Sequence, residues 1–161
     1  MALNSYLSLK GAKQGNIYGS VTQKGRENKI MVIATNHEIV SPRDPASGLA
    51  TGKLVHQPFV ITKEVDKASP LLYNALVNNE NIVSWELQFW KPSATGAEVQ
   101  YYTVKLTNAN ISSIDMKMPN NKDASLMKLE TFEEVAFTYQ TIEWIWVDGG
   151  ITATSNWSSS T

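Results

Sequence analysis

Apolar and polar residues alternate along most of this chain, which is the period-2 pattern of half-buried β-strands. The pattern is plain in residues 5–9 and again in residues 59–65, where Phe59, Ile61 and Lys63 fall on one face. We predict further strands at 17–23, 30–40, 81–91, 99–108 and 110–118, and either two strands or one bulged strand within 126–147.

The strand expected at 30–40 has two apolar faces. Ile30 and Val32 lie on one face, and Met31 and Ile33 lie on the other. Either pair is apolar enough to belong to a core, so the pattern does not choose between them.

One short helix is predicted to begin at Ser69-Pro70, because serine is a favoured N-cap and proline is favoured at the first helical position. Leu72 and Leu76 follow at helical spacing, and Asn78 ends the segment. A helix of about ten residues is not stable alone in water. We therefore expect it to dock on the sheet, where it would cover one end of a barrel.

The spacing of the strands predicts an antiparallel sandwich or barrel, because no helices of crossover length separate them. The chain has 161 residues, which suits a single domain, and no internal repeat divides it. We expect one domain at residues 1–148. We expect residues 149–161 to be a flexible polar tail, because Trp157 alone cannot give that segment a core.

A long loop between two predicted strands, residues 41–55, is the unusual part of the chain, and we call it the arm. Loops beyond about 12–15 residues without regular structure are usually functional or disordered. Pro42 and Pro45 restrict the backbone, and Gly48 and Gly52 permit turns with positive φ. This composition predicts a shaped projection from the β body, of the kind that contacts a neighbouring subunit.

Composition excludes several functions. The chain has no cysteine, which excludes disulfides, thiol nucleophiles and cysteine-ligated zinc. Its 14 basic and 15 acidic residues give a net charge of −1, so we expect no binding to nucleic acid. No apolar run approaches the roughly 20 residues that span a bilayer, and the N-terminus lacks a secretory signal pattern, so we expect no membrane insertion.

Both histidines flank the arm, with Glu38 and Asp44 nearby. A catalytic zinc site needs three converging protein ligands, and His37 and His56 supply two at most. We therefore predict no metal and no cofactor. We expect each imidazole to form a hydrogen bond across the base of the arm.

The other candidate motifs fail on their own chemistry. GLATGKL at 48–54 is similar to a phosphate-binding loop, but its glycines are one residue too close and Leu54 replaces the hydroxyl. Residues 125–128 match S-x-x-K without its partner motifs. Lys63 and Glu133 are interpreted as solvated strand positions. No catalytic constellation remains, so we expect no enzyme.

Several blocks of the sequence together match one family. They are YLSLKGAKQG at 6–15, HEIVSPRDPASGLATGK at 37–53, HQPFVITKEVDKASPLLYNAL at 56–76, and the closing strand with Tyr139, Ile142 and Trp144. On these residues, which extend over nearly all of 3–148, the chain resembles the Hcp (haemolysin-coregulated protein) family, the tube protein of bacterial type VI secretion.

The resemblance implies a mainly β fold: an antiparallel β-barrel of two sheets with one short α-helix and a long projecting loop, assembled as a hexameric ring. It implies rings that stack into a tube inside a contractile sheath, a VgrG-type spike at the tip, and small effector proteins carried in the lumen. It implies a protein that resides in the bacterial cytoplasm before firing and is then secreted, or delivered into a target cell, without a signal peptide.

The resemblance also implies that the arm contacts neighbouring subunits. The expected contact residues are Ser41, Pro42, Arg43, Asp44, Pro45, Ser47, Gly48, Gly52 and Lys53, with His37, His56 and Pro58 at the base of the loop. Two other readings stay open on the residues alone: a monomeric β-barrel that binds a small molecule, and a hydrolase that uses the two histidines.

Overall fold

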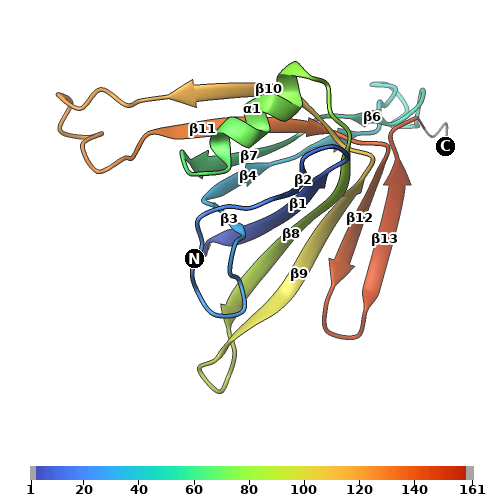
Figure 1. Ribbon diagram of the computed structural model, residues 1–161. Coiled ribbons are helices and arrows are strands. Elements are labelled where there is room, and N and C mark those ends of the chain that lie inside the picture. The colour runs from blue at the N-terminus through green and yellow to red at the C-terminus, as the bar shows by residue number, and fades with distance from the viewer. Residues whose placement is uncertain (1–2, 159–161) are drawn as a thin grey trace.

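The computed structural model describes residues 3–158, which form thirteen β-strands and one α-helix (Figure 1). The strands build two antiparallel sheets that enclose a shared apolar core, together with one small separate hairpin. The mainly β, antiparallel architecture expected from the alternation is confirmed. No helix in this part of the chain is long and apolar enough to cross a membrane.

Sheet A has seven strands. Their order is β13 (Ile151–Asn156), β12 (Thr141–Trp146), β9 (Glu98–Thr107), β8 (Ile82–Pro92) and β1 (Ser5–Gly11), and both β2 (Gly15–Ile17) and β3 (Ile30–Val32) pair with the far side of β1.

Sheet B has four strands. Their order is β10 (Asn110–Lys117), β11 (Phe132–Thr138), β7 (Phe59–Glu64) and β4 (Ala34–Asn36), and α1 (Ser69–Val77) packs against β10. The separate hairpin consists of β5 (Ile39–Val40) and β6 (Val55–His56). The expected docking of the helix on a sheet is confirmed, because one side of α1 is buried and the helix contacts β10.

Residues 30–36, expected to lie within one strand, are divided between the two sheets. β3 pairs with β1 and β4 pairs with β7, while Ile33 between them donates its backbone N–H to the carbonyl of Thr62 at 2.9 Å. The crossing joins the sheets along one side. It also shows which of the two apolar faces belongs to the core. Ile30 and Val32 are buried, whereas Ile33 on the other face is 44% exposed.

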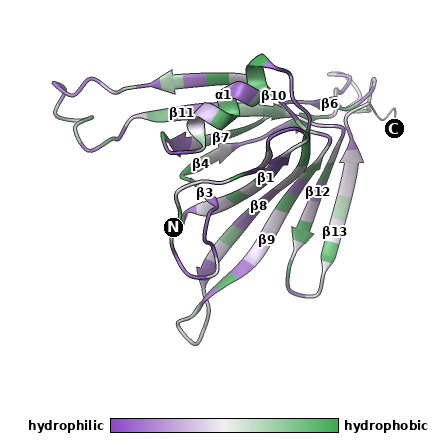
Figure 2. Cartoon of the chain, in the orientation of Figure 1, coloured by the Kyte–Doolittle hydropathy of each residue, from purple (hydrophilic) through white to green (hydrophobic). Residues whose placement is uncertain are grey.

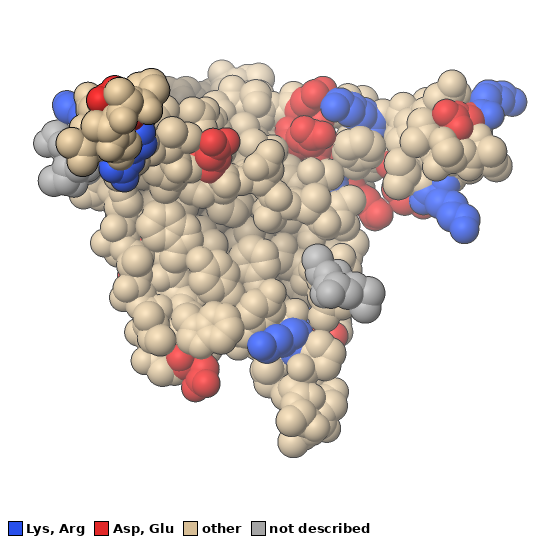
Figure 3. Space-filling model, turned by 180° about the vertical axis from the view of Figure 1, so that it is seen from behind, with Lys and Arg blue, Asp and Glu red and all other residues tan. Residues whose placement is uncertain are grey.

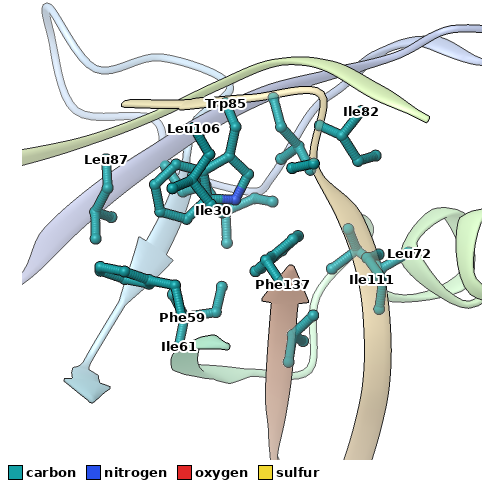
Figure 4. Packing of buried hydrophobic residues seen from close by; sticks show 14 of the residues in the cluster. Ile30, Phe59, Ile61, Leu72, Ile82, Trp85, Leu87, Leu106, Ile111 and Phe137 are labelled. Atoms are coloured by element: carbon teal, nitrogen blue, oxygen red, sulfur yellow. The ribbon is translucent and has the colours of Figure 1, made fainter. Parts of the chain in front are cut away.

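Apolar side chains from both sheets fill the space between them (Figure 4). Leu7 and Trp85 enter from sheet A, Ile61 and Phe137 from sheet B, and Leu72 from α1, and all five are buried. Green and purple segments alternate along the strands in Figure 2, which is the alternation seen in the sequence. Each side chain of this size contributes roughly 1.5–3 kcal/mol by leaving water.

A buried ion-pair cluster joins β7, β11 and the start of α1. Nζ of Lys63 lies 2.7 Å from Oε1 of Glu133 and 2.9 Å from Oδ1 of Asp66, and it donates to the hydroxyl of Ser69 at 3.1 Å. The Ser69 hydroxyl in turn donates to Glu133 at 2.8 Å. Ser69 is therefore not the helix N-cap that the sequence suggested, since the cap position is Ala68 and carries no side-chain hydrogen bond.

The interpretation of Lys63 and Glu133 as solvated strand positions is wrong. Lys63 is 0% exposed and Glu133 is 1% exposed. The reason is that β7 and β11 are neighbouring strands, with Lys63 opposite Glu133, and each of these side chains faces inward. A pair buried in this way is stable only while both charges and their hydrogen bonds are present.

The expected flexible polar tail at 149–161 is also wrong for the part that is described. Residues 151–156 form β13, which pairs with β12 from Ile151 opposite Trp146 to Asn156 opposite Thr141. Beyond the strand, the backbone N–H of Trp157 donates to the carbonyl of Gln140 at 2.8 Å. Residues 159–161 lie outside the described residues.

Two strand boundaries differ from those that the sequence pattern left open or predicted. The region 126–147 contains two strands, β11 and β12, rather than one bulged strand. The strand expected at 17–23 ends at Ile17, because the chain folds back on itself and Gly19 lies against the backbone of residues 29–30, where a Cβ would meet a carbonyl oxygen at 2.4 Å.

The cluster predicts a large stability effect for Lys63→Met. The substitution leaves Glu133 buried without its cation, and we expect the free energy of unfolding to fall by about 3–5 kcal/mol. Urea denaturation followed by circular dichroism measures this loss.

Lys67→Met is the matched control, because Lys67 is exposed and the change should stay within about 0.5 kcal/mol. The double variant Lys63→Met/Glu133→Leu removes both charges and should recover much of the loss. Wild-type stability in the Lys63→Met protein would contradict the role given to the cluster.

Candidate subunit-contact loop and its histidine base

The arm is an ordered extension of the β5–β6 hairpin. At its base β5 and β6 pair, with Val40 opposite Val55. Farther out, the N–H of Thr51 donates to the carbonyl of Pro42 at 3.0 Å, and the N–H of Asp44 donates to the carbonyl of Leu49 at 2.8 Å. The arm is therefore an irregular hairpin with its own backbone hydrogen bonds, and Figure 1 shows it at the same end of the molecule as the C-terminus.

Asp44 shapes the tip of the arm. Its carboxylate accepts hydrogen bonds from the hydroxyl of Ser47 at 2.7 Å and from the N–H of Ala46 at 3.3 Å. The hydroxyl of Ser47, followed by the N–H of Ala46, lowers the pKa of this carboxyl. Gly48 completes the turn with φ of 75°, a region that favours glycine. Gly52 does not adopt positive φ, so that part of the expectation is wrong.

The tip of the arm is exposed and carries a large apolar side chain. Leu49 is 68% exposed at the tip, and the flanking Arg43 and Lys53 are also exposed. An apolar residue between two cations, held on a hydrogen-bonded turn, is suited to contact a protein surface.

The base of the arm is built around one hydroxyl. Nε2 of His37 lies 2.9 Å from the hydroxyl oxygen of Tyr139, and Nδ1 of His56 lies 2.8 Å from the same oxygen. The other nitrogen of His56, Nε2, lies 3.1 Å from the hydroxyl of Ser155 in β13. The two sides of the arm and the C-terminal strand therefore meet at Tyr139, which follows β11.

Aromatic rings enclose this base. The ring of His37 stacks on Phe59 with centroids 5.1 Å apart, and the ring of His56 stacks on Trp157 at 5.7 Å. Trp157 also meets Tyr139 edge to face at 4.9 Å. Trp157, the residue that seemed unable to anchor the tail, thus packs between the arm base and the barrel.

Burial shifts the pKa of each ring at the base in the direction of its neutral form. It lowers the pKa of His56 and of His37, and the charge of His56 lowers the pKa of His37 further. Burial raises the pKa of the Tyr139 hydroxyl to about 12, so this group keeps its proton at physiological pH.

The structure thus separates the residues named from the sequence into two groups. His37 and His56 meet at the base, as expected for imidazoles that bond across it, and Pro58 follows β6 at a half-buried position. The remaining residues lie along the arm itself: Ser41, Pro42, Arg43, Asp44, Pro45, Ser47, Gly48, Gly52 and Lys53.

Sequence reasoning missed three residues of the base, which are Tyr139, Ser155 and Trp157. A single tryptophan in an otherwise polar segment was the one available signal, because so large an apolar ring rarely stays in water without a reason. Within residues 3–158, no three histidine or acidic side chains gather as metal ligands.

Three comparisons with known proteins agree. The family model described as "Type VI secretion system effector, Hcp" matches residues 6–146. The "Major exported protein" of Pseudomonas aeruginosa is 40% identical, over 99% of this chain and 98% of that protein.

Solved structures give the same result. The Hcp1 protein of Escherichia coli superposes with a TM-score of 0.85 at 33% identity, covering 97% of this chain and 99% of that one. The secreted protein Hcp3 of Pseudomonas aeruginosa superposes with a TM-score of 0.79 at 34% identity, with the same coverage.

The packing of Trp157 predicts that the C-terminal segment contributes to stability. Trp157→Ala should lower the free energy of unfolding by about 2 kcal/mol, because it removes a half-buried ring that packs against those of His56 and Tyr139. Ser158→Ala, at the next position, is the control and should stay within about 0.5 kcal/mol. Equal urea midpoints for the two variants would mean that the segment does not anchor the arm base.

Proposed function

Because this chain belongs to the Hcp family of type VI secretion proteins, we propose that it is a structural tube subunit that acts by assembly. Six copies form a ring, and rings stack into a tube. The observation that carries the proposal is the arm, an ordered projection with an exposed Leu49 on a body whose own core is complete. The proposed role needs no catalytic step.

Exposed apolar side chains on two sides of the molecule support a head-to-tail ring. Near the β12–β13 turn the side chains of Trp146, Val147 and Ile151 are exposed, and across the molecule Ile33 and Val65 are exposed beside the β3–β4 crossing. Different apolar surfaces on opposite sides suit a heterologous interface, which closes into a ring when the rotation between subunits allows it.

The outer face of sheet A is suited to line a lumen. One row of paired residues crosses five strands on that face: Ser8, Glu86, Lys105, Glu143 and Thr154. Lys105 stands between two glutamates, so the charges on neighbouring strands are complementary. We assign this polar row to the lumen wall, where it would hold small effector proteins by reversible polar contacts.

The overall charge pattern also suits stacked copies. Charged side chains gather at the projecting end of the β10–β11 hairpin and at the opposite upper corner, while the middle of the face in Figure 3 carries few. With a net charge of −1, repulsion between identical subunits is small.

The proposed partners follow from the tube. They are further copies of the chain, a VgrG-type spike, the surrounding contractile sheath and effectors in the lumen. The protein would be in the bacterial cytoplasm before firing and would then be exported, as the name of the Pseudomonas relative states for that protein.

The alternative of a monomeric ligand-binding barrel has less support. Such barrels keep interior space for the ligand. Here the buried side chains of Leu7, Ile61, Trp85 and Phe137 occupy the space between the sheets (Figure 4).

The test is a shortened arm. Deleting Arg43 to Lys53 and joining the ends with a short turn should leave a folded domain that no longer forms stable rings, because the contact surface is gone while the core is intact. Circular dichroism reports the fold, and native mass spectrometry reports the number of subunits.

Leu49→Asp is the companion point variant. It places a charge at an exposed site, so we expect a monomer stability within about 0.5 kcal/mol of wild type and weaker rings. Intact hexamers from the shortened protein would refute the role of the arm. Wild-type protein that is monomeric throughout would favour the ligand-binding barrel.

A further inference from the structure

The base of the arm contains an unusual proton arrangement. Two imidazole nitrogens share the single hydroxyl of Tyr139, at 2.9 Å from His37 and 2.8 Å from His56. That hydroxyl has one proton to donate and an oxygen that can accept. The two histidines of this chain are its full complement, so both of its pH-sensitive imidazoles lie at this one point.

With both imidazoles neutral, the Tyr139 hydroxyl can satisfy the two ring nitrogens that face it. The Tyr139 hydroxyl donates to one ring, and the N–H of the other ring donates to the Tyr139 oxygen. The hydroxyl of Ser155 can accept from or donate to Nε2 of His56, so it suits either tautomer.

One added proton is also tolerated, but two are not. If one ring is charged, it donates to the tyrosine oxygen while the hydroxyl still donates to the neutral ring. If both are charged, both nitrogens must donate to one oxygen, and the tyrosine proton loses its acceptor within the arrangement. Two cations then lie within two hydrogen-bond lengths of each other in a partly buried site, where their repulsion is weakly screened.

We propose that His37, His56 and Tyr139 form a proton-sensitive latch that fixes the base of the arm to the C-terminal strand at neutral pH and releases it on acidification. The latch joins the segments on both sides of the arm to β11 and, through Ser155, to β13.

Within residues 3–158, the surroundings of the latch supply no compensating anion. The groups that face the two rings are Phe59 of β7, Ser155 of β13 and Trp157, none of which is charged. Glu38 is next to His37 in the chain but is exposed. Among the described residues, the charge that acts on His37 is that of His56.

The direction of the pH dependence follows from the pKa values. Burial lowers the pKa of both imidazoles below the ordinary 6.5, so the released state binds protons more readily than the latched one. The contribution of the latch is therefore complete above about pH 6.5 and is lost as pH falls through that value toward the lowered pKa values. The Tyr139 hydroxyl remains protonated over this whole range.

The consequence for assembly rests on the proposed tube function. If the arm contacts neighbouring subunits, a loosened arm base weakens the ring at acidic pH. The latch itself is a property of the single chain and does not require the ring.

Hydrogen–deuterium exchange on the full-length protein tests the latch. At the base, the N–H of Gln57 donates to the carbonyl of Glu38, and in the core the N–H of Ile82 donates to the carbonyl of Ala109. After correction for the intrinsic rate, we expect protection of Gln57 to be clearly lower at pH 5.0 than at pH 7.5, because two charged rings repel each other across one hydroxyl. Protection of Ile82 should not change.

Two variants make the test specific. His37→Gln leaves one imidazole, so the second charge cannot form and the fall in protection should be much smaller than in the wild type. Tyr139→Phe removes the shared oxygen, so protection at the base should already be low at pH 7.5. Equal protection of the wild-type base at both pH values, or an undiminished fall in His37→Gln, would overturn the latch.

Native mass spectrometry at both pH values separates the latch from the tube. Rings at pH 7.5 that dissociate at pH 5.0 in the wild type but persist in His37→Gln support both. A pH-dependent base in a protein that never forms rings supports the latch and contradicts the proposed function. The exchange measurement is repeated with Leu49→Asp added to each protein, because weaker rings prevent neighbouring subunits from protecting the arm base.

Discussion

The rest of the structure depends on one strand segment that changes sheets. β3 pairs with β1 and β4 with β7, and Ile33 between them is held by its hydrogen bond to Thr62. This crossing joins two open antiparallel sheets along one side, so that both can bury their apolar faces in a single core. It also directs the chain out of sheet B toward the arm, so the position of the arm follows from the way the barrel is joined.

Buried polar groups then fix parts of the molecule that apolar packing leaves adjustable. Lys63 and Glu133 join the start of α1 to two neighbouring strands, and the Tyr139 hydroxyl joins the arm base to β11. Apolar contacts tolerate small shifts, whereas a buried hydrogen bond or ion pair is costly to lose when its partner moves. Both clusters therefore act as positional constraints at the ends of a core that is otherwise apolar.

This arrangement supports a function that depends on contacts between protein surfaces. The core is apolar, one sheet face carries a polar row, and exposed apolar side chains such as Leu49, Trp146 and Ile33 lie at the arm tip, near the β12–β13 turn and at the β3–β4 crossing. Membership of the Hcp family and the close superposition with solved Hcp proteins support the proposal that these surfaces act in assembly. The proposed latch would add a condition to that role, because it holds the arm base only while the two imidazoles are not both charged.

Patterns and motifs in the sequence were enough to predict most of the strands, the single helix and the family. Alternation such as that of Phe59, Ile61 and Lys63 is a local property of the backbone, so it can be read without knowing which strands become neighbours. Proline and Gly48 likewise predicted a shaped arm, because they act through φ of their own residues.

Whether a given side chain meets water or a buried partner became clear from the tertiary structure alone. Lys63 follows the same alternation whether its side of the strand meets water or Glu133, and Trp157 is part of a polar segment until β13 brings it against His56 and Tyr139. Burial, pairing and a shared hydroxyl are relations between residues far apart in the chain. These neighbours are brought together when the sheets pack, and the local pattern of polar and apolar residues does not show which of them will meet.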